Sequence, residues 1–119
     1  MFIINQTPIG KNYKPYIIAE LSANHGGSLN KAKETIKSAK LAGANAIKIQ
    51  SYTPDTMTIN SNKKDFKIKR GLWKNYNLYE LYEKAYTPFE WHFELFEYAK
   101  QLDITLFSTP FDETAVCLL

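Results

Sequence analysis

Strand-like and helix-like segments alternate along this chain, and the alternation limits its fold more than any other feature. Residues 16–21, 46–50 and 104–108 are short runs rich in apolar and β-branched residues. Segments with apolar residues at helical spacing separate these runs. Parallel sheets have this order of elements, because a helix must carry the chain back to the start of the next strand. We therefore expect an α/β fold with a parallel sheet of at least three strands.

Residues that commonly start or stop helices mark the helix boundaries. The first helical pattern follows Ser28, a favourable N-cap, and ends before Gly43. The sequence Thr-Pro-Phe-Glu at 87–90 matches a capping box, with Thr87 at the N-cap and proline at the first helical position. Asp112 is placed to cap a last helical segment. Each predicted strand is therefore followed by a predicted helix.

The long segment between Gln50 and Thr87 has no sustained period, apart from a short helical pattern at residues 78–85. An insertion of this size in a compact domain is usually functional or mobile. It contains a basic stretch in which Phe66 and Trp73 are interleaved, as in proteins that bind single-stranded nucleic acid. A solvated loop with two anchoring aromatic residues is the simpler interpretation, and attraction of an anionic substrate is a third. We expect no nucleic-acid partner.

Composition excludes several classes of protein. The net charge of +3 is too small to indicate nucleic-acid binding by itself. Cys117 is the only cysteine, so the chain forms no intrachain disulfide and no zinc site with two or more cysteines. No apolar run approaches the roughly 18 residues that a membrane helix needs, and residues 1–4 are too short for a signal peptide. We expect a cytoplasmic protein that does not enter a membrane.

Polar residues stand near the carboxyl ends of the first two predicted strands. Glu20 lies near the end of an otherwise apolar strand, where a buried carboxylate needs a partner. Lys48 and Gln50 lie on one face of the next strand, because side chains alternate between the two faces. Ligands of parallel α/β folds bind at the carboxyl ends of the strands. We expect a Glu20–Lys48 pair there, which is either part of a functional site or a structural ion pair.

The loops at the same edge supply weaker candidates. Ser108 and Thr109 precede the predicted helix start at Asp112, where free amides could hold a phosphate or carboxylate, although serine and threonine are common in ordinary turns. Asn24 and His25 follow the first strand and precede two glycines, but no nucleotide-binding glycine fingerprint is present. His25 is a candidate ligand or acid–base group. His92 is expected to be an ordinary surface residue.

Two architectures fit these elements, an open doubly wound sheet and a (β/α)8 barrel. The last helical pattern stops at Leu119 after about two turns, without a stop signal. A barrel takes about 250 residues, so three strands would be less than half of one. We therefore expect residues 1–119 to be the N-terminal part of a longer domain.

Several motifs resemble the sialic acid synthase family. Three of them occur in order at residues 18–25 (IAELSANH), 46–50 (AIKIQ) and 107–111 (FSTPF). Within that family, the branch that makes pseudaminic acid is similar at further segments, which are residues 52–58, 71–73, 78–82, 85–92 and 111–116. Phe89 stands where this branch is expected to have tryptophan. The resemblance covers essentially the whole chain, but only the first part of the family's catalytic domain.

The resemblance implies a fold and an activity. The chain would form about three βα units at the start of a (β/α)8 TIM barrel, without the C-terminal antifreeze-like domain of the family. The complete protein would be a homodimer that condenses phosphoenolpyruvate with the amino sugar 2,4-diacetamido-2,4,6-trideoxy-altrose, giving pseudaminic acid and phosphate. Synthesis of N-acetylneuraminate or legionaminic acid is the alternative, as are a non-catalytic fragment and a phosphate-binding α/β module.

The resemblance also implies roles for individual residues. Lys48 would bind phosphoenolpyruvate, Gln50 would contact the sugar, and Glu20 would hydrogen-bond the sugar near the reacting centre. Thr109, with Ser108 nearby, would help to hold the phosphate. A divalent metal ion, typically Mn²⁺, would polarise the sugar aldehyde as a Lewis acid. Its histidine ligands would come from parts of the protein beyond this chain.

Overall fold

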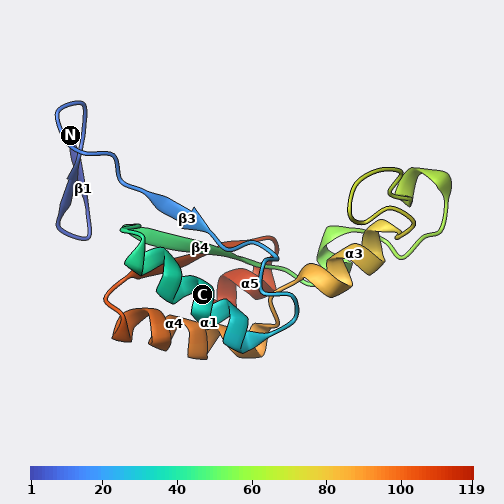
Figure 1. Ribbon diagram of the computed structural model, residues 1–119. Coiled ribbons are helices and arrows are strands. Elements are labelled where there is room, and N and C mark those ends of the chain that lie inside the picture. The colour runs from blue at the N-terminus through green and yellow to red at the C-terminus, as the bar shows by residue number, and fades with distance from the viewer.

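The computed structural model describes residues 1–119, and its centre is a parallel three-stranded sheet (Figure 1). The strands are β3 (Ile18–Glu20), β4 (Ala46–Ser51) and β5 (Thr105–Pro110), in the order β3-β4-β5. The register places Glu20 beside Lys48, and Lys48 beside Phe107. The predicted α/β fold with a parallel sheet is confirmed, and all three strands end at the same edge.

Helices α1 (Leu29–Leu41) and α4 (His92–Gln101) cover one face of this sheet, and the short helix α5 (Glu113–Leu118) follows β5 (Figure 1). The predicted start of α1 is confirmed, because the Ser28 side chain accepts a hydrogen bond from the Lys31 amide. After α1, Gly43 adopts a φ of +88°, a left-handed conformation that glycine tolerates best. No helix of the structure has the length and apolar character needed to cross a membrane.

The hydrophobic core lies between the sheet and these two helices. Ile47 and Ile49 of β4 and Leu106 of β5 pack against Ile36 of α1 and Leu95 of α4. Every second residue of each strand therefore points into the core, while the residues between them point to the other face. Burying a side chain of this size contributes about 1.5–3 kcal/mol, so this layer accounts for much of the stability.

The start of α4 differs from the prediction. Pro88 occupies the cap position of a 3₁₀ turn, η2 (Phe89–Trp91), and the α-helix begins at His92. No side chain caps either element, because the Thr87 hydroxyl lies against His25 instead. The capping-box prediction is therefore wrong in its geometry, although a helical turn does begin just after Pro88.

A hairpin that the sequence did not predict precedes the sheet. Strands β1 (Phe2–Ile4) and β2 (Thr7–Ile9) pair in antiparallel register, with Asn5 and Gln6 at the turn. Both turn residues have positive φ angles, 43° and 64°, as a two-residue type I′ turn requires. Asn-Gln is a weaker signal for this turn than Asn-Gly, so the sequence does not indicate the hairpin. It does not pair with the three-stranded sheet (Figure 1), and its turn contacts the start of β5 through a 3.4 Å hydrogen bond from the Asn5 side-chain amide to the Thr105 hydroxyl.

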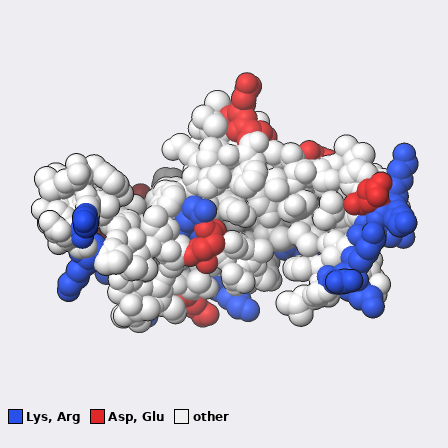
Figure 2. Space-filling view, turned by 90° about the horizontal axis from the view of Figure 1, so that it is seen from above, with Lys and Arg blue, Asp and Glu red and all other residues white.

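The segment after β4 forms an arm that extends beyond the carboxyl edge of the sheet (Figure 1). It contains α2 (Pro54–Met57), the 3₁₀ turn η1 (Lys64–Phe66) and α3 (Leu78–Ala85), which confirms the predicted short helix. The basic side chains gather at its far end (Figure 2) and comprise Lys63, Lys64, Lys67, Lys69, Arg70 and Lys74. Because of the arm and the hairpin, the radius of gyration is 16.5 Å, against about 13.5 Å for a compact chain of this length.

Candidate functional site

The face of the sheet opposite the helices carries polar side chains at its carboxyl edge. Glu20, Lys48, Gln50 and Thr109 alternate with residues of the core, so they point away from α1 and α4. Phe107 lies on the same face and is 36% exposed. No helix lies against this face of the sheet in Figure 1. This open face is the candidate site.

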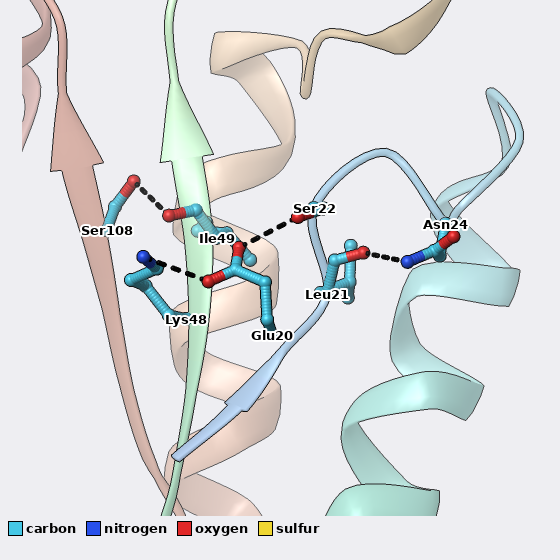
Figure 3. A network of polar contacts seen from close by, with 7 residues as sticks. All are labelled: Glu20, Leu21, Ser22, Asn24, Lys48, Ile49 and Ser108. Atoms are coloured by element: carbon cyan, nitrogen blue, oxygen red, sulfur yellow. Dashed lines mark hydrogen bonds and ion pairs between the residues drawn. The ribbon is translucent and has the colours of Figure 1, made fainter.

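An ion pair links the first two strands on the open face. The Lys48 ammonium Nζ lies 3.0 Å from Oε2 of Glu20 (Figure 3). The side chains of Lys48 and Glu20 are 32% and 38% exposed, so both still contact solvent. Exposed pairs of this kind contribute about 0–1 kcal/mol to stability. The predicted pair is thus confirmed in its geometry, and its contribution to folding is small.

Ser22 supports this pair and was not a predicted site residue. Its hydroxyl donates a hydrogen bond of 3.1 Å to Oε1 of Glu20, the oxygen that does not contact Lys48 (Figure 3). Ser22 has a φ of +49°, a left-handed conformation that costs a non-glycine residue about 1–2 kcal/mol. Such strain is often found at functional sites. The sequence carried no signal for the conformation, because serine rarely adopts it.

Gln50 and Thr109 lie next to one another in the sheet register. Neither side chain makes a hydrogen bond to another residue of the chain, while the Glu20 carboxylate, which pairs with Lys48 in the register, makes two polar contacts. The amide of Gln50 and the hydroxyl of Thr109 are therefore able to bind a ligand without breaking an internal contact. An ammonium, a carboxylate, an amide and a hydroxyl together suit a ligand with both an anionic part and hydroxyl groups.

The structure does not bring Asn24 or Ser108 to the open face. The Asn24 amide donates a 2.9 Å hydrogen bond to the Leu21 carbonyl and closes the turn after β3 (Figure 3). Ser108 alternates with Phe107 and Thr109, so its hydroxyl points to the helix side, where it lies 3.3 Å from the Ile49 carbonyl (Figure 3) and 2.5 Å from the Ser51 hydroxyl. The substrate-binding roles expected for both residues remain predictions, and in this chain their side chains have internal partners.

His25 belongs to the loop that follows β3, and it has no exposed surface. Its Nδ1 accepts a 3.0 Å hydrogen bond from the Gly27 amide, and its Nε2 faces the Thr87 hydroxyl. Trp91 packs edge-on against the imidazole, with ring centroids 5.3 Å apart. Burial lowers the pKa of His25, so the ring is neutral at pH 7. This placement makes His25 a link between the loop and the start of α4, and its predicted role as a substrate ligand gains no support.

The expectation that His92 is an ordinary surface residue is wrong. His92 is buried in the first turn of α4, where its Nδ1 lies 3.1 Å from the Pro88 carbonyl. Its Nε2 lies 2.6 Å from the hydroxyl of Ser51, at the end of β4. Burial lowers the pKa of His92, so the neutral imidazole is favoured. The helix turns this residue toward the sheet, because His92, Leu95 and Ala99 share one face of α4.

Asp112 already occupies the helix start that was a candidate anion site. Its Oδ1 accepts a 2.8 Å hydrogen bond from the Ala115 amide, and its Oδ2 accepts one from the Thr56 hydroxyl. A carboxylate at this position repels a second anion. Asp112 therefore caps α5 and attaches the arm to it. On the arm, Tyr52 packs edge-on against Tyr82 and Phe111, which fixes the arm at the carboxyl edge of the sheet.

The open face is shallow. None of the four hollows on the protein surface is lined by Glu20, Lys48, Gln50 or Thr109. Binding sites for small molecules usually bury about 70–90% of the ligand. In addition, no three histidine, cysteine, aspartate or glutamate side chains come together in a group that could hold a metal ion. The open face is therefore an exposed surface and not an enclosed pocket.

Comparison with known proteins identifies relatives of this chain. The sequence model of the NeuB family matches residues 35–119. The chain is 62% identical, over 98 residues, to the pseudaminic acid synthase of Campylobacter jejuni, which corresponds to 82% of this chain and 29% of that protein. It is 54% identical, over 105 residues, to the pseudaminic acid synthase of Helicobacter pylori, which corresponds to 88% of this chain and 31% of that protein.

A solved structure supports the same relationship. The N-acetylneuraminic acid (sialic acid) synthetase from Leptospira borgpetersenii superposes with a TM-score of 0.77 at 30% sequence identity, covering 99% of this chain and 36% of that one. The chain spans about 30% of the length of the curated relatives it matches.

Proposed function

Because the chain belongs to the NeuB family, we propose that it is the N-terminal part of a pseudaminic acid synthase. The complete enzyme condenses phosphoenolpyruvate with 2,4-diacetamido-2,4,6-trideoxy-altrose and water, and releases pseudaminic acid and phosphate. The observation that carries this proposal is the solvated Glu20–Lys48 pair at the carboxyl edge of a parallel sheet. This is the edge at which enzymes of parallel α/β folds bind their ligands.

In the proposed complete protein, the three parallel strands begin a (β/α)8 barrel. The open face of the sheet then points into the barrel, where the remaining strands supply the other walls of the site. Two observations support this arrangement: the helices cover one face only, and large apolar side chains such as Ile18 and Phe107 are exposed on the other. A C-terminal antifreeze-like domain and a homodimer belong to the same proposal, as does a cytoplasmic location.

Lys48 binds phosphoenolpyruvate in this scheme. Its ammonium supplies charge-assisted hydrogen bonds, which are about twice as strong as neutral ones, to an anionic group of the substrate. Thr109 lies on the next strand of the sheet, and its hydroxyl donates a hydrogen bond to the phosphate. Glu20 holds Lys48 in place from the opposite side, at 3.0 Å, so the ammonium is positioned before the substrate arrives.

Gln50 and Glu20 bind the amino sugar. Their amide and carboxylate oxygens accept hydrogen bonds from sugar hydroxyls, and the Gln50 amide also donates. In the overall reaction, C3 of phosphoenolpyruvate forms a bond to the aldehyde carbon of the open-chain sugar. Water adds at C2, the C2–O bond to phosphate breaks, and a ketone remains. The residues of this chain contribute by holding the two substrates side by side, which alone can supply a large part of the rate enhancement.

A divalent metal ion, expected to be Mn²⁺, belongs to the proposal for the complete enzyme. When bound, such an ion polarises a carbonyl oxygen. The residues of this chain do not form a site for it, since the candidate face offers one carboxylate paired with a lysine and both histidines are buried in internal contacts. Its ligands are therefore proposed to lie in other parts of the enzyme.

A chimeric synthase tests the proposal. This chain replaces the corresponding N-terminal part of the Campylobacter jejuni enzyme, with which it shares 62% identity over 98 residues. Phosphate release is measured with phosphoenolpyruvate, Mn²⁺ and either the altrose derivative or N-acetylmannosamine. The expected result is turnover with the altrose derivative and little with N-acetylmannosamine.

The parent enzyme is the positive control. A chimera that matches the parent in circular dichroism and in molecular mass, but releases no phosphate, would contradict the proposed function. Equal or greater turnover of N-acetylmannosamine would contradict the assignment of the sugar, and would favour synthesis of another nonulosonic acid.

A further inference from the structure

A continuous line of hydrogen bonds runs behind the candidate site, on the helix side of the sheet. It joins the Pro88 carbonyl to His92, His92 to Ser51, and Ser51 to Ser108. The distances are 3.1, 2.6 and 2.5 Å. Ser51 and His92 are both buried, and the proposed function uses neither of them.

Chemistry fixes the direction of these hydrogen bonds. The Pro88 carbonyl only accepts, so Nδ1 of His92 carries the proton that it receives. In a neutral imidazole Nε2 is then an acceptor, and the Ser51 hydroxyl donates to it. Since the Ser51 proton goes to His92, the Ser51 oxygen accepts from Ser108 at 2.5 Å, and the single proton of the Ser108 hydroxyl is then shared between Ser51 and the Ile49 carbonyl, 3.3 Å away. Each buried polar group of the line has a partner.

The line touches the strands at the positions next to the site. Ser51 directly follows Gln50 on β4, and Ser108 directly precedes Thr109 on β5. Because neighbouring residues of a strand point to opposite faces, anchoring Ser51 and Ser108 on the helix side fixes how Gln50 and Thr109 point on the open side. The line also ties both strand ends to the first turn of α4.

We propose that His92, Ser51 and Ser108 are positioning residues, whose hydrogen bonds hold Gln50 and Thr109 in place for the two substrates. This inference rests on the proposed function. It assigns to Ser108 an action through the strand instead of direct contact with phosphate. His92 is central, because it supplies the acceptor for Ser51 and connects the strands to α4.

The chimeric synthase tests the inference with two variants of His92. His92→Phe keeps an aromatic ring but removes both ring nitrogens, whereas His92→Gln keeps an acceptor able to reach Ser51. We expect His92→Phe to lower kcat/KM about tenfold for both substrates, since small misplacements of binding groups are costly. His92→Gln is expected to recover most of that loss. Ile36→Val, a core change on α1 at a residue that takes no part in these hydrogen bonds, is the control for lowered stability alone.

A double-variant comparison separates positioning from direct contact. Ser108→Ala should lower kcat/KM in the original chimera, but change it less than about twofold when His92→Phe is already present, because the line is then broken. A residue that contacts phosphate directly would have its full effect in both backgrounds, and only for phosphoenolpyruvate. That result would overturn the inference.

The inference also fails if His92→Phe reduces the melting temperature as Ile36→Val does, yet keeps kcat/KM within about twofold of the original. It fails equally if His92→Gln folds normally and recovers nothing. Each of these results leaves the chimera active, so the proposed function would stand while the inference falls. An inactive original chimera is instead the failure of the proposed function.

Discussion

The two faces of the parallel sheet divide stability and chemistry between them. On the helix side, Ile47, Ile49 and Leu106 are buried in one apolar layer. On the open side, the same strands present Glu20 and Lys48, which stay partly exposed and pair with each other. Since the side chains alternate, adjacent residues of one strand lie either in the core or on the open face.

Substitutions on the two faces should therefore have different effects. A change on the helix side removes buried apolar contacts and should lower the free energy of unfolding. A change on the open side removes an ion pair of small energetic weight and should spare folding. The hydrogen bonds of Ser51, His92 and Ser108 are the exception, because they lie on the helix side and yet adjoin the binding residues.

The first prediction concerns a core residue on the helix side of the sheet, where a substitution should lower stability the most. Ile49→Ala in the chimeric synthase removes a fully buried side chain and should lower the free energy of unfolding by about 2–5 kcal/mol. Urea denaturation measures this change. A loss below about 1 kcal/mol would mean that this face is not the main source of stability in the region.

The second prediction concerns Glu20 and is smaller. Glu20→Gln keeps the shape of the side chain but removes the charge beside Lys48. We expect kcat to fall about tenfold, which corresponds to roughly 1.4 kcal/mol in the barrier. The affinity for phosphoenolpyruvate should not weaken, since the new amide oxygen can still accept a hydrogen bond from Lys48 and a negative charge near an anionic substrate has been removed. Steady-state kinetics and calorimetry measure the two quantities, and a weaker affinity would refute this assignment of Glu20.

The smallest expected effect is the pH dependence of stability between about pH 7.5 and 5. Burial lowers the pKa of both His25 and His92 in the folded protein. Below the ordinary histidine pKa of about 6.5, the unfolded chain therefore binds more protons than the folded one, and stability falls as the pH falls. His92→Gln should make this decline shallower. Thermal melts across the range provide the measurement, and an identical slope would contradict a buried, neutral His92.

Much of the helix side could be predicted from the sequence. The Ser28 cap, the apolar period of α1 and the alternation in β4 are local signals, and the structure follows each of them. The Glu20–Lys48 contact was also predictable, because neighbouring parallel strands bring their carboxyl ends together. These features depend on a few residues close in sequence or on one rule of topology.

The remaining features depend on contacts between distant segments. A position at the start of a helix predicts that His92 is exposed. In the structure His92 is buried, and its ring is hydrogen-bonded to the hydroxyl of Ser51, 41 positions away in the sequence. The sequence after Thr87 matches a helix cap, yet the Thr87 hydroxyl contacts the His25 ring instead of the helix amides. Ser108 was grouped with Thr109 by its position at the strand end, although alternation places it on the other face. A local sequence pattern does not indicate contacts with residues that are distant in the sequence.

Binding of phosphoenolpyruvate by a Lys48 variant tests whether the open face binds substrate. Lys48→Met in the chimeric synthase should weaken phosphoenolpyruvate binding at least tenfold in calorimetry, because charge-assisted hydrogen bonds contribute about 1.5–3 kcal/mol. The free energy of unfolding should change by less than about 1 kcal/mol, since the ion pair is partly exposed. Unchanged affinity, with or without a large loss of stability, would show that Glu20 and Lys48 form a structural ion pair and would contradict substrate binding at the open face.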